Sequence, residues 1–280
     1  MTLYDQDYYA QGKKNYRFSK LFQPILALLY FWRVKATLSR LPHVYQAGSR
    51  ALDVGAGRGE FLFYLRQKGW QVVGTQISQA AIAAAKEHYD LDLVETFLPK
   101  AKELGQFDLI TYWHVFEHLD NPEEHLTAVS TLLKDEKSVL IIEVPNPESL
   151  GARLCYQTWL GSDPENHINM LPLSALQQML TAARLEIIRL DAFSSKFTLI
   201  YLYSALCGWF SQGYLDFDYF LELLKRPTAT LLSPQVGKTL LLILISPLAV
   251  LGSLVLTPIG IWLKQPETLR IYAQLRDHNG

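Results

Sequence analysis

Three glycines stand at alternate positions in the segment LDVGAGRGEF, residues 52–61, where a β-like run passes into a helical pattern. Glycine at such a turn lets the backbone approach a ligand closely, and the start of the helix presents amide groups to it. A dinucleotide-binding loop would need the spacing G-x-G-x-x-G, but here the next glycine after Gly57 is Gly59, and the position expected for the third glycine holds Glu60. The spacing argues against NAD or FAD, and by itself it is also compatible with a plain tight turn.

A second group of reactive side chains follows residues 107–112 of a β-like run and comprises Trp113, His114, Glu117 and His118. In open parallel sheets, ligands bind at the carboxyl ends of the strands. A neutral histidine at that edge can take a proton from a hydroxyl group. His118 is therefore our first candidate for a general base, although a structural role at the sheet edge fits the sequence equally well. Glu117 and His118 are too few ligands to specify a metal ion, and we predict no metal site.

A sheet must position these residues. Short β-rich runs alternate with helical patterns from Arg50 to about Leu190, which predicts an α/β core with helices on both faces of a parallel sheet. The expected strands are 51–54, 71–76, 91–97, 107–113, 138–144 and 185–190, with a final β-like run at 268–275. The stretch between the last two runs, residues 194–267, is expected to be an insertion into the core.

Several motifs in this order resemble the class I S-adenosylmethionine-dependent methyltransferases, particularly the small-molecule group that includes the ubiquinone-biosynthesis O-methyltransferases. They are LDVGAGRGEF (52–61), VVGTQIS (72–78), FDLITYWHVFEHLDNP (107–122) and IIEVPNPESLG (141–151). The resemblance covers about Arg50 to Leu190. It implies a Rossmann-like sheet that is mostly parallel with the last strand antiparallel, and an enzyme whose cofactor is S-adenosyl-L-methionine.

The resemblance also implies the cofactor contacts. Asp53 and the backbone of Gly55, Gly57 and Gly59 would hold the methionine portion, since a carboxylate at a strand end can accept hydrogen bonds from an ammonium group. Gln76 would meet the ribose, at a position where the family usually has an acidic residue. The other expected cofactor contacts are Thr96 and Phe97 near the adenine, and Trp113 and His114 after the next strand. Phe97 is equally compatible with an ordinary core position.

The catalytic residues expected by this resemblance are His118 and His167. Similar enzymes carry a histidine in a loop before the last core helix, and His167 occupies such a loop at residues 163–167. Methyl transfer is an in-line displacement, so the main tasks of the protein are alignment and the exclusion of water. A base is needed only if the acceptor is a hydroxyl group.

Charged residues make up only 19% of the chain, and none occurs among residues 239–263, between Lys238 and Lys264. We predict that this segment dips into a membrane and returns, with bends at Pro247, Gly252 and Pro258. The reason is that the resemblance implies strands of one sheet near Leu185 and at 268–275, so both ends of the insertion must lie on the same side. A soluble subunit interface is the alternative.

Residues 1–40 carry seven basic and two acidic side chains, around an apolar run at 24–34. This pattern predicts a helix on an anionic membrane surface, or alternatively a helix packed on the core. The N-terminus does not resemble a secretory signal, and Cys155 and Cys207 form no disulfide framework, which favours a reducing compartment. The net charge of −1 argues against a uniformly basic nucleic-acid-binding protein.

The sequence thus predicts an N-terminal segment (1–49), a cofactor-binding core (50–193), a membrane-associating insertion (194–267) and a final strand with a tail (268–280). We expect a methyltransferase at the cytoplasmic face of a membrane that acts on a small or lipid-linked acceptor, with O-methylation favoured. Two alternatives remain open: a soluble dimeric methyltransferase in the cytoplasm, and a non-catalytic, membrane-tethered protein that binds the cofactor. The sequence leaves the oligomeric state undefined.

Overall fold

The computed structural model describes residues 28, 31–41, 48–96, 98, 102–194, 197–225, 230–231 and 235–276. The chain divides into two compact units. The first comprises Met1–Glu143, Ser174–Leu190 and Ile271–Gly280, and the second comprises Val144–Leu173 and Asp191–Arg270. The predicted insertion is therefore joined in the second unit by the segment that follows strand β4.

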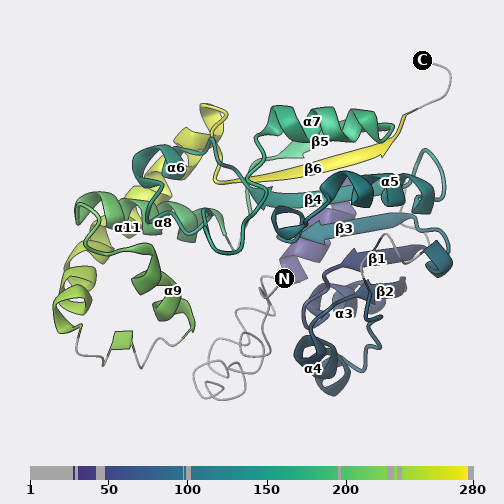
Figure 1. Ribbon diagram of the computed structural model, residues 1–280, viewed down its shortest axis with the longest axis horizontal. Coiled ribbons are helices and arrows are strands. Elements are labelled where there is room, and N and C mark those ends of the chain that lie inside the picture. Colours follow the sequence, from purple (N-terminus) through teal and green to yellow (C-terminus); the bar gives the residue numbers. More distant parts are fainter. Residues whose placement is uncertain are drawn as a thin grey trace. The chain divides into compact units, whose positions relative to one another are not determined.

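A six-stranded sheet runs through the core (Figure 1), in the order β2-β1-β3-β4-β6-β5. β1 pairs in parallel with β2 and β3, and β3 pairs in parallel with β4, while the last strand is antiparallel. β4 is buried at every residue, as expected for a central strand covered on both faces. The predicted Rossmann-like sheet is confirmed. The strands are β1 (Arg50–Val54), β2 (Gln71–Thr75), β3 (Leu109–Trp113), β4 (Val139–Pro145), β5 (Leu185–Asp191) and β6 (Thr268–Leu275).

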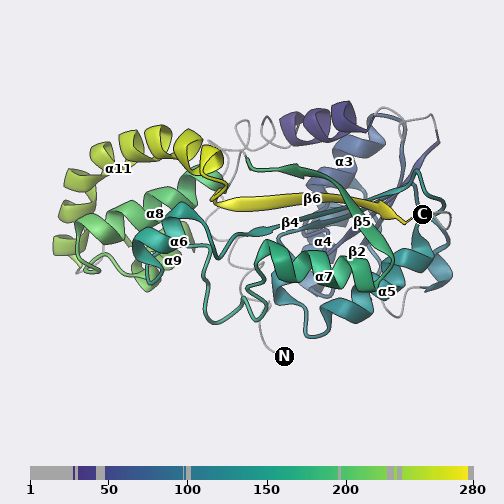
Figure 2. The ribbon, with the colours of Figure 1, turned by 90° about the horizontal axis from the view of Figure 1, so that it is seen from above.

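Helices cover both faces of the sheet (Figure 2). Residues 31–40 and α3 lie on one side, where Val34, Phe61 and Leu65 pack with Leu109 and Tyr272. α5 and α7 lie on the other side, and α4 packs beside α3 in a separate apolar cluster. The helices of this unit are α3 (Glu60–Arg66), α4 (Gln79–Tyr89), α5 (Pro122–Leu132) and α7 (Leu173–Ala182), with the short 3-10 turns η2 (Lys102–Leu104) and η3 (Phe116–His118).

The strand expected at residues 91–97 is reduced to a single bridge between Thr75 and Val94, so this prediction is wrong in extent. The Val94 amide donates to the carbonyl of Gly74 at 2.8 Å, and the Val94 carbonyl accepts from the amide of Gln76 at 3.0 Å. Phe97 lies outside the described residues.

The second unit is helical and has its own core around Trp159. Its helices are α6 (Leu150–Cys155), α8 (Thr198–Phe210), α9 (Phe217–Lys225) and α11 (Val236–Trp262). Glu267, just before β6, accepts hydrogen bonds from the indole of Trp159 (2.7 Å), the amide of Gly151 (2.8 Å) and the hydroxyl of Ser149 (3.2 Å). Burial raises the pKa of Glu267 to about 7, although these three donors act to lower it. This carboxyl group joins α6 to the start of the final strand.

The apolar segment 239–263 forms part of one continuous helix, and the predicted bends at Pro247, Gly252 and Pro258 are wrong. α11 has 27 residues with both prolines inside it, and Figure 2 shows it as a curved but unbroken helix. Packing against α8 holds it, because Tyr203 bonds to Ser246 at 2.7 Å across the two helices. Ser253 also donates to the carbonyl of Ala249, one turn earlier. Curvature therefore replaces a break at the prolines.

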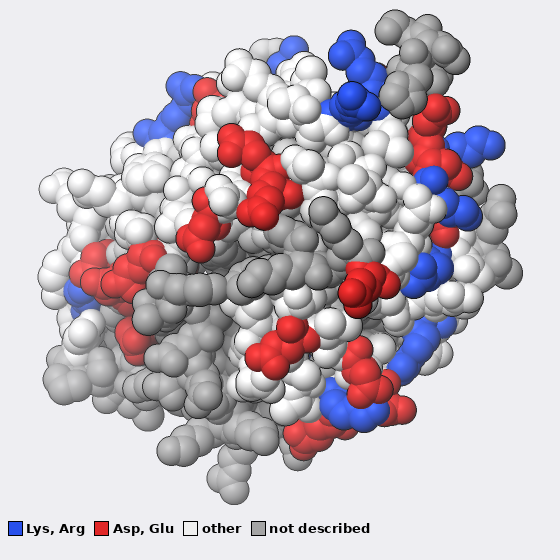
Figure 3. All heavy atoms as spheres, turned by 45° about the vertical axis from the view of Figure 1, so that its right-hand side comes forward, with Lys and Arg blue, Asp and Glu red and all other residues white. Residues whose placement is uncertain are grey.

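Charged side chains of both signs occur on the face of the molecule shown in Figure 3. Asp and Glu gather there in several separate groups, whereas Lys and Arg lie mainly along one edge. Among the described residues on that face, the positive charge forms no continuous area of the kind that follows a phosphate backbone.

Candidate functional site

The three glycines of the loop have different roles in the structure, although all have positive φ, at 68°, 57° and 82° for Gly55, Gly57 and Gly59. A Cβ atom on Gly55 would lie 2.6 Å from a methyl group of Val115, and one on Gly59 would lie 2.7 Å from Leu91. A Cβ on Gly57 would meet no heavy atom within 4 Å. Gly55 and Gly59 therefore permit close packing within the protein, while Gly57 faces open space that a ligand can occupy.

Asp53 is the last residue but one of β1, close to this loop, and is only 3% exposed. Its carboxylate accepts a hydrogen bond from the Thr111 hydroxyl at 2.7 Å. Burial raises the pKa of Asp53 to about 7, while Thr111 and the charge of Arg33 act in the opposite direction. A buried carboxyl group beside an open glycine backbone fits the α-ammonium group of S-adenosylmethionine, since a bound cation would favour its ionised form.

Gln76 follows β2 and is buried, but its carbonyl oxygen is already engaged. It accepts from the amides of Ile77 at 2.7 Å and Ser78 at 3.1 Å, which closes the turn before α4. The side-chain NH₂ group is the part of Gln76 that can donate to a ribose oxygen. Its assignment to the ribose stays a prediction, as does that of Thr96.

Trp113 ends β3 and His114 follows it directly, with the left-handed φ of 55° that non-glycine residues rarely adopt. The ring of His114 lies between two buried carboxylates, with Nδ1 3.3 Å from Glu117 and Nε2 3.2 Å from Glu143. Burial acts to lower the pKa of His114, but these two carboxylates outweigh it and the pKa lies above its ordinary value. Both ring nitrogens of His114 thus face protein carboxylates.

Arg33 is the residue of this site that sequence reasoning missed. It is 7% exposed and reaches Glu143 at 2.9 Å, and its guanidinium lies 4.7 Å from the centre of the Trp113 ring. The available signal was a single basic residue inside the apolar run 24–34. The sequence pattern counts it among the basic side chains that favour an anionic membrane surface, whereas the structure buries it in the first unit.

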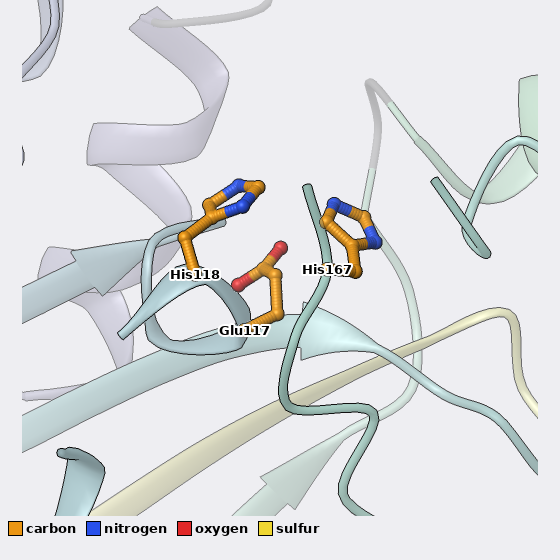
Figure 4. A group of neighbouring side chains, drawn as sticks. All are labelled: Glu117, His118 and His167. Atoms are coloured by element: carbon orange, nitrogen blue, oxygen red, sulfur yellow. The ribbon is translucent and has the colours of Figure 1, made fainter. Parts of the chain in front are cut away.

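The two candidate bases are placed by different units. His118 is half-buried at the end of η3, next to Glu117, and its amide donates to the carbonyl of Val115 at 3.0 Å. Figure 4 shows the Glu117 and His118 side chains projecting from this one turn after β3. His167 belongs to the second unit, where its Nδ1 lies 2.8 Å from the carbonyl of Gly161. A carbonyl can only accept, so Nδ1 carries the proton and Nε2 is the basic nitrogen of neutral His167.

The sequence matches the methyltransferase domain family over residues 28–190, more than half of the chain. A ubiquinone biosynthesis O-methyltransferase of Burkholderia multivorans is 32% identical over 99 residues, which cover 33% of this chain and 43% of the relative. The corresponding enzyme of Marinobacter nauticus is 28% identical over 113 residues, covering 37% and 48%. The matched region thus spans less than half the length of these relatives.

Solved structures have the same fold. A SAM-dependent methyltransferase from Archaeoglobus fulgidus superposes with a TM-score of 0.53 at 22% identity, covering 87% of this chain and 94% of that one. A putative sarcosine dimethylglycine methyltransferase from Galdieria sulphuraria gives 0.55 at 14% identity, covering 88% and 85%. The chain therefore belongs to the methyltransferase domain family, and it is an enzyme that uses S-adenosylmethionine.

Proposed function

We propose that this enzyme methylates a hydroxyl group of an apolar, lipid-linked acceptor at the cytoplasmic face of a membrane. The observation that carries the proposal is the exposed apolar face of α11, attached to a methyltransferase core. The acceptor atom and the membrane contact depend on different residues.

O-methylation is supported by the names of the similar proteins, which are ubiquinone biosynthesis O-methyltransferases, and by the two candidate histidines. S-adenosylmethionine supplies an electrophilic methyl group, so the protein has to align the acceptor oxygen, exclude water and take up the hydroxyl proton. His118 lies at the carboxyl edge of the sheet, where ligands bind in this class of fold. It is our first candidate for the proton acceptor, and His167 is the second.

Membrane association is supported by the surface of α11. One narrow stripe of this helix is buried, including Leu242, Ile245 and Ala249, while the rest of its circumference is exposed and apolar. Leu244 is 74% exposed and Trp262 is 81% exposed. This is the one described helix long and apolar enough to cross a membrane, and only 28% of its most apolar stretch is buried. A core helix of a soluble protein would be mostly buried, so lipid is the better match for this surface.

Topology favours contact from one side of the membrane. β5 precedes the helices α8, α9 and α11, and β6 follows them, yet β5 and β6 are neighbours in one sheet. At about 1.5 Å per residue, α11 is roughly 40 Å long, but a single crossing would put its ends on opposite sides. A helix lying along the interface, with Lys238 and Lys264 near its two ends, agrees with the sheet order.

The N-terminal segment gives a more limited indication, because most of the run 24–34 lies outside the described residues. Val34 is buried against the sheet, in agreement with a helix packed on the core, whereas Phe31 and Trp32 are exposed. Contact of these two rings with a membrane stays a prediction.

The chemical part of the proposal is tested with a lipid extract and methyl-labelled S-adenosylmethionine. We expect label in an apolar fraction with the native protein and much less with His118→Asn. Label only in the water-soluble fraction would contradict the lipid-linked acceptor. Cofactor binding without transfer to any fraction would favour the non-catalytic alternative.

The membrane part is tested by flotation with phosphatidylglycerol vesicles, comparing the native protein with Leu244→Asp/Leu251→Asp. Ile188→Asp, which changes an exposed apolar residue on β5, is the matched control. We expect the double variant to lose flotation and the control to keep it. Conversion of a dimer into a monomer by the double variant, with no binding of the native protein to vesicles, would instead identify the face of α11 as a subunit interface.

A further inference from the structure

A chain of buried ionic contacts links four residues that are far apart in the sequence. Arg33 contacts Glu143 at 2.9 Å, Glu143 contacts His114 at 3.2 Å, and His114 contacts Glu117 at 3.3 Å. This ionic chain begins at Arg33 in the helix 31–40, passes the carboxyl ends of β4 and β3, and ends in η3. All four residues belong to the first unit.

We propose that this ionic chain fixes the turn η3, and with it His118, at the carboxyl edge of the sheet. Glu117 and His118 are consecutive residues of η3, so holding the carboxylate of Glu117 also limits the positions of His118. Arg33, Glu143, His114 and Glu117 are then positioning residues of the methyl-transfer site. The inference rests on the proposed function for the role of His118, but the chain itself can be tested without any acceptor.

The chemistry of His114 supports this assignment. A neutral imidazole has one N–H group and can donate to one carboxylate only, whereas the imidazolium can donate to both. When His114 is protonated, these ionic contacts join two positive groups, Arg33 and His114, to two carboxylates, and the charges cancel. His114 is thereby fixed as a bridge between η3 and β4.

The energetics of burial favour a positioning role over a stabilising one. Glu143 is fully buried and Glu117 is 1% exposed. Well-packed apolar residues of the same volume are often at least as stabilising as buried ion pairs. His114 also has an unfavourable backbone conformation, which persists only where surrounding contacts enforce it. The strained backbone of His114 and the buried carboxylates together indicate that these contacts hold the turn after β3 in one conformation.

Arg33 connects the ionic chain to the candidate cofactor residues. Its guanidinium lies on the ring of Trp113, and its charge acts on Asp53. Trp113 in turn contacts Phe61 of α3 edge-to-face, with ring centres 5.1 Å apart. The helix 31–40 thus supplies a cation to the centre of the site. Removing that cation is expected to loosen Glu143, then His114, then η3.

The test uses the whole protein with histidine labelled at the ring carbon between the two nitrogens, followed by NMR as a function of pH. The charged groups facing His114 are Glu117 from η3 and Glu143 from β4, with Arg33 behind Glu143 and Asp53 near Arg33. In the native protein, we expect His114 to remain protonated at a pH where an exposed histidine is neutral. Glu143→Gln should lower the pKa of His114, because it removes one of the two carboxylates that favour the protonated ring, and it should also shift the signal of His118.

Two further variants separate positioning from general stability. Arg33→Lys keeps the charge and should leave the His118 signal closer to native than Arg33→Met does. Arg40→Gln is the matched control, since Arg40 lies on the same helix and bonds to the carbonyl of Ala36 within it. This control should change neither histidine signal. An unchanged His118 signal in Glu143→Gln, or a His114 that titrates like an exposed histidine in the native protein, would overturn the proposal.

Turnover of a labelled acceptor gives the second readout. We expect Glu143→Gln to lower kcat by roughly 10-fold to 100-fold, with little change in affinity for S-adenosylmethionine, because a displaced base slows chemistry. Full activity of His118→Asn would contradict the proposed function, whatever the NMR result. An intact His118 signal in Glu143→Gln would contradict the positioning chain, whatever the activity of His118→Asn. The two failures are therefore distinguishable.

Discussion

Gly57→Ala separates the effect of a side chain on the cofactor from its effect on the fold. The φ of Gly57 is 57°, and a Cβ there meets no protein atom within 4 Å, so the substitution adds backbone strain but no clash in the free protein. The cost of placing alanine in a left-handed conformation is roughly 1–2 kcal/mol, and the protein should stay folded. Its new methyl group would occupy the open space that we assign to the cofactor.

Gly69 provides a matched control, because it too has positive φ, at 86°, and open space around a Cβ, but it lies after α3. Gly69→Ala should lower the free energy of unfolding by a similar amount. By calorimetric titration, we expect S-adenosylmethionine to bind Gly57→Ala about 100-fold more weakly, which corresponds to roughly 2.8 kcal/mol, and Gly69→Ala as tightly as the native protein. Gly57→Val should abolish binding.

Gly55→Ala should have the opposite balance of effects, with a large change in stability. Its Cβ would lie 2.6 Å from Val115, so the main effect should be a loss of stability, measurable as a lower unfolding midpoint. Unchanged cofactor affinity in folded Gly57→Ala, or an equal loss in Gly69→Ala, would refute the assignment of the open side of the loop to the cofactor.

Three further predictions concern the acid-base groups and the membrane surface. His118→Asn should lower turnover by roughly 100-fold with little change in cofactor affinity, and loss of stability instead would indicate the structural role that the sequence left open. Because the pKa of Asp53 is raised to about 7 and a bound ammonium group favours the ionised form, affinity for S-adenosylmethionine should increase as the pH rises from 6 to 8, with proton release on binding. Asp53→Asn should bind weakly without this pH dependence, and calorimetry in two buffers of different ionisation enthalpy measures the released proton. In a protein without Cys155 and Cys207, single cysteines at Lys238 and Lys264 should both react with an impermeant reagent in inverted vesicles and not in intact cells; labelling on opposite faces would establish a true span.

The sequence by itself determined the sheet and the glycine loop. Short apolar runs between helical patterns predict strands, because a strand that is buried on both faces needs nearly continuous apolar residues. An example is β4, where all of Val139–Pro145 is buried. Turn chemistry is also local, so the role of Gly57 was recognisable from neighbouring residues. The family resemblance then gave the cofactor, which the match over residues 28–190 confirmed.

The tertiary structure alone decided which distant residues meet. Arg33 and Glu143 are 110 positions apart, and no periodicity or spacing predicts that one basic residue in an apolar run will enter the site. The same holds for His114, whose two carboxylate partners come from η3 and β4. The bends expected in α11 were absent because its partner α8 holds the helix through contacts that a local proline rule does not include. Local rules depend on a few neighbouring residues, whereas buried ion pairs and helix packing depend on the whole fold.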